Sequence, residues 1–136
     1  MGRIIAVDYG TKRSGLAVTD PLKIIAGPLT ALPSSEIMDF LKKYTEKEAT
    51  EALVVGMPLK PDGSDTDATP AVRVFVRQLQ KLFPQIPVHL HDERFTSKMA
   101  LDAMIEGGTS KKYRRNKFNT DKVSAVLILQ SFLATL

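Results

Sequence analysis

Three carboxylate positions, far apart in the chain, are candidates for metal chemistry: Asp8, the adjacent pair Asp92 and Glu93, and Asp121. Asp8 and the Asp92–Glu93 pair each follow a run of residues with a strand pattern. The carboxyl ends of parallel strands lie at one edge of an open α/β sheet, and ligands of such proteins bind at that edge. Two carboxylates about 4 Å apart repel by ~4 kcal/mol at an effective dielectric near 20, so three need a cation. Oxygen ligands favour Mg²⁺ or Mn²⁺, and a pair of these ions can promote phosphodiester cleavage.

Each of these carboxylates also has a simpler explanation. Asp8 could cap the turn that follows it or pair with a cation of that turn. Asp121, in the first turn of the last predicted helix, would oppose the helix dipole and contribute ~0.3–1 kcal/mol. Glu93 stands next to Arg94 and could form a surface ion pair, which is worth little. The sequence pattern alone leaves these alternatives open.

Histidines and glycines mark further positions of interest. His89 and His91 alternate along a predicted strand, which fits a zinc-binding or catalytic pair but also two hydrogen-bonded residues near the end of a strand. Gly10 and Gly15 are expected to serve the turn after the first strand, and Gly56 to end a later strand.

Cationic side chains stand near the acidic positions in the sequence. Residues 111–117 hold five cations in seven positions and come shortly before Asp121. Such a run is either a solvated loop or a group that binds the phosphates of a nucleic acid. The candidate nucleic-acid-binding residues are Lys12, Arg13, Arg94, Lys111, Lys112, Arg114, Arg115 and Lys117.

The elements that would position these residues follow from hydrophobic periodicity. Strands are predicted at residues 4–8, 16–18, 24–32, 52–56 and 88–91, and Pro28 places the third at a sheet edge or at a bulge. Helices are predicted from about residue 36 to 48, from Pro70 to 83 with Asp67 as N-cap, and from 96 or 97 to 107. A last helix is predicted from Asp121 onward, capped by Asn119 and Thr120. Right-handed crossovers make the last two strands parallel to the first, so an α/β domain with a mixed sheet is expected.

Composition bounds the class of protein. The 136 residues are 43% hydrophobic and 25% charged, which is typical of one globular domain. Cysteine is absent, which excludes disulfides and thiolate metal sites. No apolar run approaches the ~20 residues that span a bilayer and no signal peptide is visible, so a cytoplasmic protein without a membrane partner is expected. The net charge of +4 weakly favours polyanionic partners.

Four sequence blocks, at residues 8–18, 54–64, 92–97 and 121–125, together resemble the YqgF family. The resemblance implies an RNase H-like domain over residues 1–136, with strands one to three antiparallel and strands four and five parallel to the first. It also implies that Asp8, Glu93 and Asp121 are the catalytic carboxylates that bind Mg²⁺ or Mn²⁺. The implied activity is endonucleolytic maturation of the 5′ end of 16S rRNA in the bacterial cytoplasm, or resolution of Holliday junctions.

The chain departs from the family pattern in two places. Ser124 stands before Ala125, where paired alanines are usual, and the basic segment extends further from Asp121 than expected. Serine at position 124 is a small residue that should leave the carboxylate ligands undisturbed. The longer distance of the basic segment from Asp121 affects the expected contact with phosphates more than it affects the carboxylates.

Two other functions compete with a nuclease. A non-catalytic nucleic-acid-binding module of transcription or ribosome assembly would bind with a steep salt dependence and cleave nothing. A nucleotide-binding domain of the actin and sugar-kinase kind shares the Asp-x-Gly-Thr motif at Asp8, but those proteins close two such domains around ATP. The sequence leaves open the choice between RNA and branched DNA, between one metal ion and two, and between a monomer and a homodimer.

Overall fold

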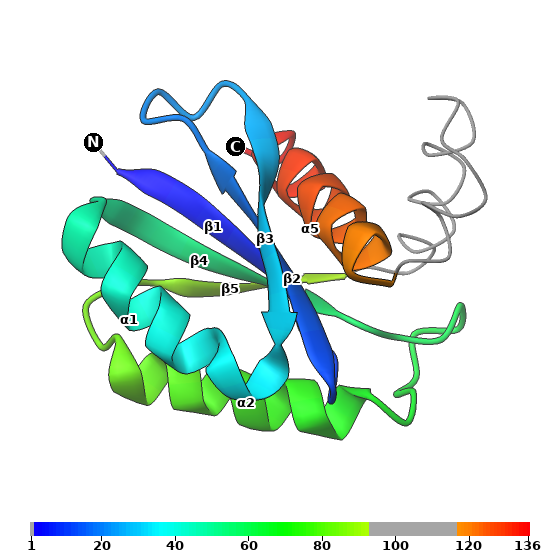
Figure 1. Ribbon diagram of the computed structural model, residues 1–136. Helices are drawn as coiled ribbons and strands as arrows, with labels where there is room; N and C mark the ends of the chain where they lie inside the picture. The colour runs from blue at the N-terminus through cyan, green and yellow to red at the C-terminus, as the bar shows by residue number, and fades with distance from the viewer. Residues whose placement is uncertain (1, 93–116) are drawn as a thin grey trace.

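The computed structural model describes residues 2–92 and 117–136, and in the second range it describes side chains from residue 122 onward (Figure 1). Its centre is a five-stranded sheet in the order β3-β2-β1-β4-β5. The strands are β1 (Arg3–Asp8), β2 (Arg13–Thr19), β3 (Ala26–Pro33), β4 (Thr50–Met57) and β5 (Val88–Asp92). β1, β2 and β3 are antiparallel neighbours, while β4 is parallel to β1 and β5 is parallel to β4. The predicted mixed sheet is confirmed.

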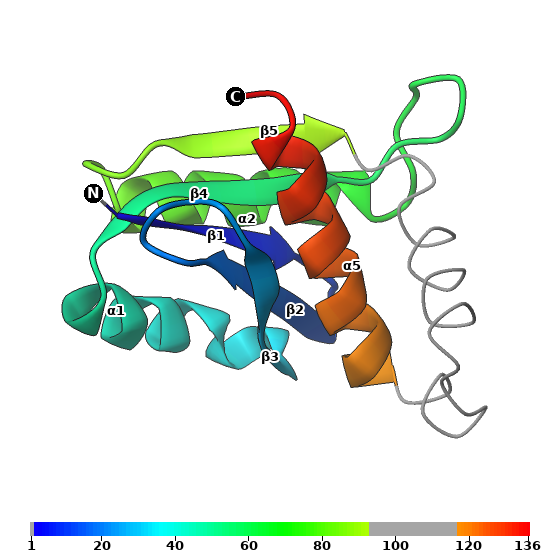
Figure 2. The same cartoon turned by 90° about the horizontal axis from the view of Figure 1, so that it is seen from above.

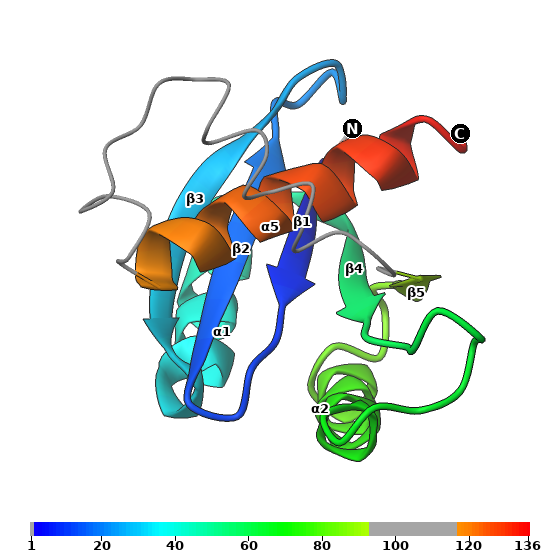
Figure 3. The same ribbon diagram turned by 90° about the vertical axis from the view of Figure 1, so that its right-hand side faces the viewer.

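Helices cover both faces of this sheet. They are the short 3-10 helix η1 (Ser34–Glu36), α1 (Ile37–Lys47), α2 (Thr69–Leu82) and α5 (Lys117–Leu133). α1 and α2 lie on one face, and α5 crosses the other face over β1 to β4 (Figures 2 and 3). No helix in the described part of the chain is long and apolar enough to cross a membrane.

The continuous apolar runs of β1 and β4 are explained by these two layers. Ile5 and Val7 of β1 pack with α1 and α2 in one core cluster, whereas Ile4 and Ala6 pack with α5 in the other. Alternate residues of a strand point to opposite faces, so a strand covered on both sides must be apolar throughout. The polar residue that breaks the run, Asp8, therefore falls where β1 leaves the core.

β3 lies at the edge of the sheet, as Pro28 predicted, and it also carries a bulge. Leu16 is paired with Thr30 but Ala17 with Pro28, so Leu29 is an extra residue between them. Proline cannot donate to a strand ladder, and an edge position with a local bulge accommodates it.

Several boundaries differ from the prediction. Gly15 lies within β2 and pairs with Asp8, so its assignment to the turn was wrong: β2 extends beyond its apolar run because backbone pairing continues past it. Gly56 lies within β4, one residue before its last residue Met57, close to the predicted end of that strand. α2 begins at Thr69 after Ala68, so Asp67 is not its N-cap, although Pro70 lies in the first turn as predicted. α5 begins at Lys117, four residues before the predicted start. The helix predicted from residue 96 lies outside the described residues.

Candidate active site

The carboxyl ends of β1, β4 and β5 lie at one edge of the sheet, which faces the viewer in Figure 3. Asp8 is the last residue of β1 and is partly exposed there, with its Cα paired to that of Gly15. Asp92 ends β5 and is paired with Met57 at the end of β4. The predicted convergence of these strand ends is confirmed. Glu93, the next residue along the chain, lies outside the described residues.

The N-terminal end of α5 lies on the same side of the molecule as these strand ends (Figures 1 and 2). Asp121 is the fifth residue of α5, so its backbone belongs to the second turn. A helix dipole acts mainly on charges within the first turn, so the earlier helix start weakens the view that Asp121 serves only to oppose the dipole. The side chain of Asp121 is not described.

The carboxylates described at this edge, those of Asp8 and Asp92, offer oxygen atoms, which suit a hard divalent ion. Asp8 supplies a carboxylate at the end of a strand, and oxygen ligands are those that Mg²⁺ and Mn²⁺ prefer. Among residues 2–92 and 122–136 no group of three acidic or histidine side chains could hold a metal. That result concerns only one of the three predicted ligands, because Glu93 and the side chain of Asp121 lie outside those ranges.

The loop after Asp8 is held by two serines. Ser14 Oγ accepts a hydrogen bond from the backbone N–H of Gly10 at 3.2 Å, and Ser34 Oγ donates to the carbonyl of Gly10. The two hydroxyls lie 2.7 Å apart, and the N–H of Ser34 donates to the carbonyl of Lys12 at 2.9 Å. The N–H of Gly10 is thus bonded to Ser14 of β2 and its carbonyl to Ser34 of η1, which fixes the backbone beside Asp8.

The same loop is also attached to helix α2 and carries two of the predicted cations. The ring of Tyr9 stacks on that of Phe75 in α2, with centroids 4.2 Å apart and planes 15° from parallel. A pocket of about 220 Å³ is lined by Gly10, Thr11, Lys12 and Arg13. Lys12 and Arg13 therefore line a pocket in the loop that follows Asp8, which is compatible with a phosphate-binding role. Of the other predicted cations, Lys117 begins α5 without a described side chain, and Arg94, Lys111, Lys112, Arg114 and Arg115 lie outside the described residues.

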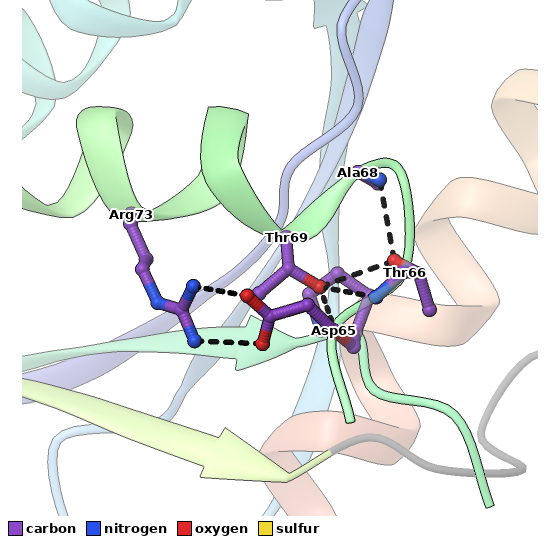
Figure 4. A network of polar contacts seen from close by, with 6 residues as sticks. Asp65, Thr66, Ala68, Thr69 and Arg73 are labelled. Carbon is purple, nitrogen blue, oxygen red and sulfur yellow. Dashed lines mark hydrogen bonds and ion pairs between the residues drawn. The ribbon is translucent and has the colours of Figure 1, made fainter. Parts of the chain in front are cut away.

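Residues 58–68, which lead from β4 to α2, form a second loop at this edge, and Thr69 holds it at its base (Figure 4). Thr69 is fully buried; its hydroxyl donates to the carbonyl of Pro58 at 2.6 Å and accepts from the N–H of Thr66 at 2.8 Å. Thr66 Oγ1 in turn accepts from the N–H of Ala68 at 3.2 Å. These bonds fix the loop before α2, but no side chain caps the first turn of the helix in the way that was predicted for Asp67.

An ion pair holds the same loop from outside. Arg73 of α2 donates to both carboxylate oxygens of Asp65, at 2.5 and 2.8 Å. The hydrogen bond from Arg73 lowers the pKa of Asp65 below its ordinary value of 3.8. Because folding lowers the pKa of Asp65, the ion pair is intact at neutral pH. Its contribution to stability is lost only in acid, as the pH falls through the lowered pKa of the folded state. This pair could not be predicted from the sequence, because helical periodicity does not indicate which exposed cation meets a loop eight residues away.

Replacing Thr69 by valine is expected to lower the free energy of unfolding by about 1–3 kcal/mol, because it leaves the Pro58 carbonyl and the Thr66 N–H without their partner. Thr69→Ser keeps the hydroxyl and should cost about 1 kcal/mol, for one buried methyl group. Urea denaturation of the two variants measures this difference. Equal free energies for Thr69→Val and the parent chain would show that the hydroxyl does not hold the loop.

The two histidines contact helix α5. His91 Nε2 and Ser131 Oγ are 2.7 Å apart, and the rings of His89 and His91 lie 5.2 and 6.3 Å from that of Phe132. Both side chains thus join the edge strand β5 to the helix that covers it. This arrangement favours hydrogen-bonded and packed residues over the zinc or catalytic pair that the alternation also allowed.

Comparison with known proteins places the chain in a family. The sequence profile described as RuvX, Holliday junction resolvase, matches residues 2–135. A protein of Amoebophilus asiaticus is 51% identical over 135 residues, covering 99% of this chain and 96% of that protein. A protein of Porphyromonas gingivalis is 49% identical over 133 residues, covering 98% of this chain and 96% of that protein. Both carry the provisional name of pre-16S rRNA nuclease.

Two solved structures of other proteins share the fold of this chain. The chain is similar to T. thermophilus RuvC in complex with a Holliday junction substrate, with a TM-score of 0.61 and 14% identity over 99% of this chain and 98% of that one. It is similar to the fowlpox virus Holliday junction resolvase, with a TM-score of 0.59 and 12% identity over 98% and 99% of the two chains. At this level of identity the likeness establishes the fold alone, and it confirms the RNase H-like sheet.

Proposed function

Since the chain belongs to the RuvX family of nucleases, we propose that Asp8, Glu93 and Asp121 are its catalytic residues and hold divalent ions at the C-terminal edge of the sheet. The observation that carries the proposal is the parallel pairing of β1, β4 and β5, which brings the end of β1 at Asp8 and the end of β5 at Asp92 to one edge. Glu93 follows that second strand end directly. Three carboxylates that meet there require a cation, which is the reason to expect a metal.

Each group has a distinct part in the proposed reaction. Bound Mg²⁺ or Mn²⁺ would supply an activated water and stabilise the oxygen that leaves the phosphorus. The Asp8 carboxylate would hold the ion at a strand end whose backbone is fixed by the Ser14 and Ser34 hydroxyls. Lys12 and Arg13 would bind the phosphate backbone beside Asp8, and cationic residues beyond β5 would extend that contact.

The substrate that we propose is the precursor of 16S rRNA, cut near its 5′ end. Relatives about 50% identical over the whole chain carry that activity in their names, which favours it over a four-way DNA junction. Residues 1–136 would form a single nuclease domain that works in the cytoplasm, away from any membrane.

Removal of divalent metal is expected to abolish cleavage and to leave nucleic-acid binding largely intact. The test incubates the purified chain with precursor 16S rRNA or a four-way junction, with Mn²⁺ or EDTA, and maps the cuts by gel. Cleavage with Mn²⁺ and none with EDTA supports the proposal. Cleavage in EDTA refutes the metal role. Salt-sensitive binding without cleavage at any Mg²⁺ or Mn²⁺ concentration would identify a binding module instead.

A further inference from the structure

The two loops that leave the sheet beside Asp8 are both fastened to the first two turns of α2. The loop after β1 is attached where Tyr9 stacks on Phe75. The loop after β4, the strand next to β1, is attached through Thr69 and through the pair between Asp65 and Arg73 (Figure 4). One short piece of helix therefore fixes the backbone on two sides of the candidate metal ligand.

The second loop is exposed at its tip and yet carries backbone hydrogen bonds of its own. Lys60 and Ser64 are joined by a hydrogen bond from N–H to carbonyl at 2.8 Å, and Gly63 donates back to Lys60 at 2.8 Å. Gly63 has a φ of 89°, and Leu59 and Asp65 form an antiparallel bridge. A segment ordered in this way before binding loses less entropy when a ligand arrives.

The pair between Asp65 and Arg73 is exposed, with 45% and 46% of the two side chains accessible to solvent. Exposed pairs contribute little to stability, so the contact needs another explanation. Its two hydrogen bonds set the position and direction of the loop, since a bidentate guanidinium–carboxylate contact has a defined geometry. It also neutralises a carboxylate that would otherwise repel a polyanion.

We propose that Arg73, acting through Asp65, is a positioning residue of the nuclease reaction. It holds residues 58–68 as a rigid wall of the nucleic-acid-binding site next to Asp8, and Lys60 on that wall contacts the phosphate backbone. This inference rests on the proposed function and adds a second contact surface, on the β4 side, to the one formed by Lys12 and Arg13.

The test compares steady-state cleavage and thermal stability of matched variants. Arg73→Gln is expected to lower kcat/KM about tenfold, mainly through a higher KM, with the melting temperature within a few degrees of the parent chain. Arg77→Gln makes the same change of charge one turn further along α2 and should lower kcat/KM by no more than about twofold. A purely structural contact would shift the melting temperature and leave KM in place.

Two double variants separate positioning from charge. Exchange of the pair, Asp65→Arg with Arg73→Asp, should restore kcat/KM to within about threefold of the parent, because the contact is rebuilt. Asp65→Asn with Arg73→Gln removes both charges and the geometry, and should stay impaired. Full activity of this neutral pair, or of Arg73→Gln alone, overturns the inference. Absence of cleavage by the parent chain would overturn the proposed function and this inference with it.

Discussion

Asp8→Asn is expected to reduce cleavage by about 10²–10⁴-fold, because a metal contributes several kcal/mol to the transition state and each 1.36 kcal/mol is worth tenfold in rate. Asparagine has the shape of aspartate but no charge, so the end of β1 should keep its conformation. Removal of a negative charge that faces phosphate should leave binding as tight as before, or tighter. The measurements are the cleavage rate with Mn²⁺, the affinity by fluorescence anisotropy, and the melting temperature.

A matched control separates this effect from a general loss of charge. Asp39→Asn makes the same substitution at an exposed position of α1 and is expected to cleave at the parent rate. If Asp8→Asn also cleaves at the parent rate, the carboxylate has no part in the reaction. If its melting temperature falls by many degrees, Asp8 has a structural role that the rate alone cannot separate.

The sheet could be predicted because its central strands are defined by local pattern. The apolar run before Asp8 and the run that ends near Gly56 are too apolar to lie anywhere but between two layers, and both are buried. Pro28 correctly predicted that β3 lies at the sheet edge, because proline has no backbone N–H to donate to a neighbouring strand. The end of β1 followed from the same pattern, and with it the position of Asp8.

The contacts that fix the loops and that join β5 to α5 could not be predicted, because they connect segments whose proximity depends on the whole fold. The hydrogen bond between His91 and Ser131 spans 40 residues. The pair between Asp65 and Arg73 depends on how a polar loop folds back over the start of α2. The start of α5 at Lys117 was missed because Asn119 and Thr120 were taken as a cap, although they lie within the helix.

Gly10→Ala tests the claim that the backbone after Asp8 has no freedom to move. A Cβ at this position would lie 2.5 Å from the carbonyl oxygen of Arg13, closer than real contacts allow. That oxygen belongs to backbone paired with Pro33 of β3, so it cannot swing aside as a side-chain end would. The variant should lower the free energy of unfolding by about 1–3 kcal/mol.

The backbone shift that Gly10→Ala imposes should also slow cleavage, because Gly10 connects Asp8 to the loop that carries Lys12. A shift of about 1 Å beside reacting groups can lower the reaction rate by about 10²-fold. Gly27→Ala is the matched control: among the described residues no atom lies within 4 Å of its Cβ position, so its stability should change by less than about 0.5 kcal/mol. Urea denaturation and the cleavage rate measure both variants. A Gly10→Ala protein as stable and active as Gly27→Ala would mean that the loop yields freely and that the serine hydroxyls do not hold Asp8 in place.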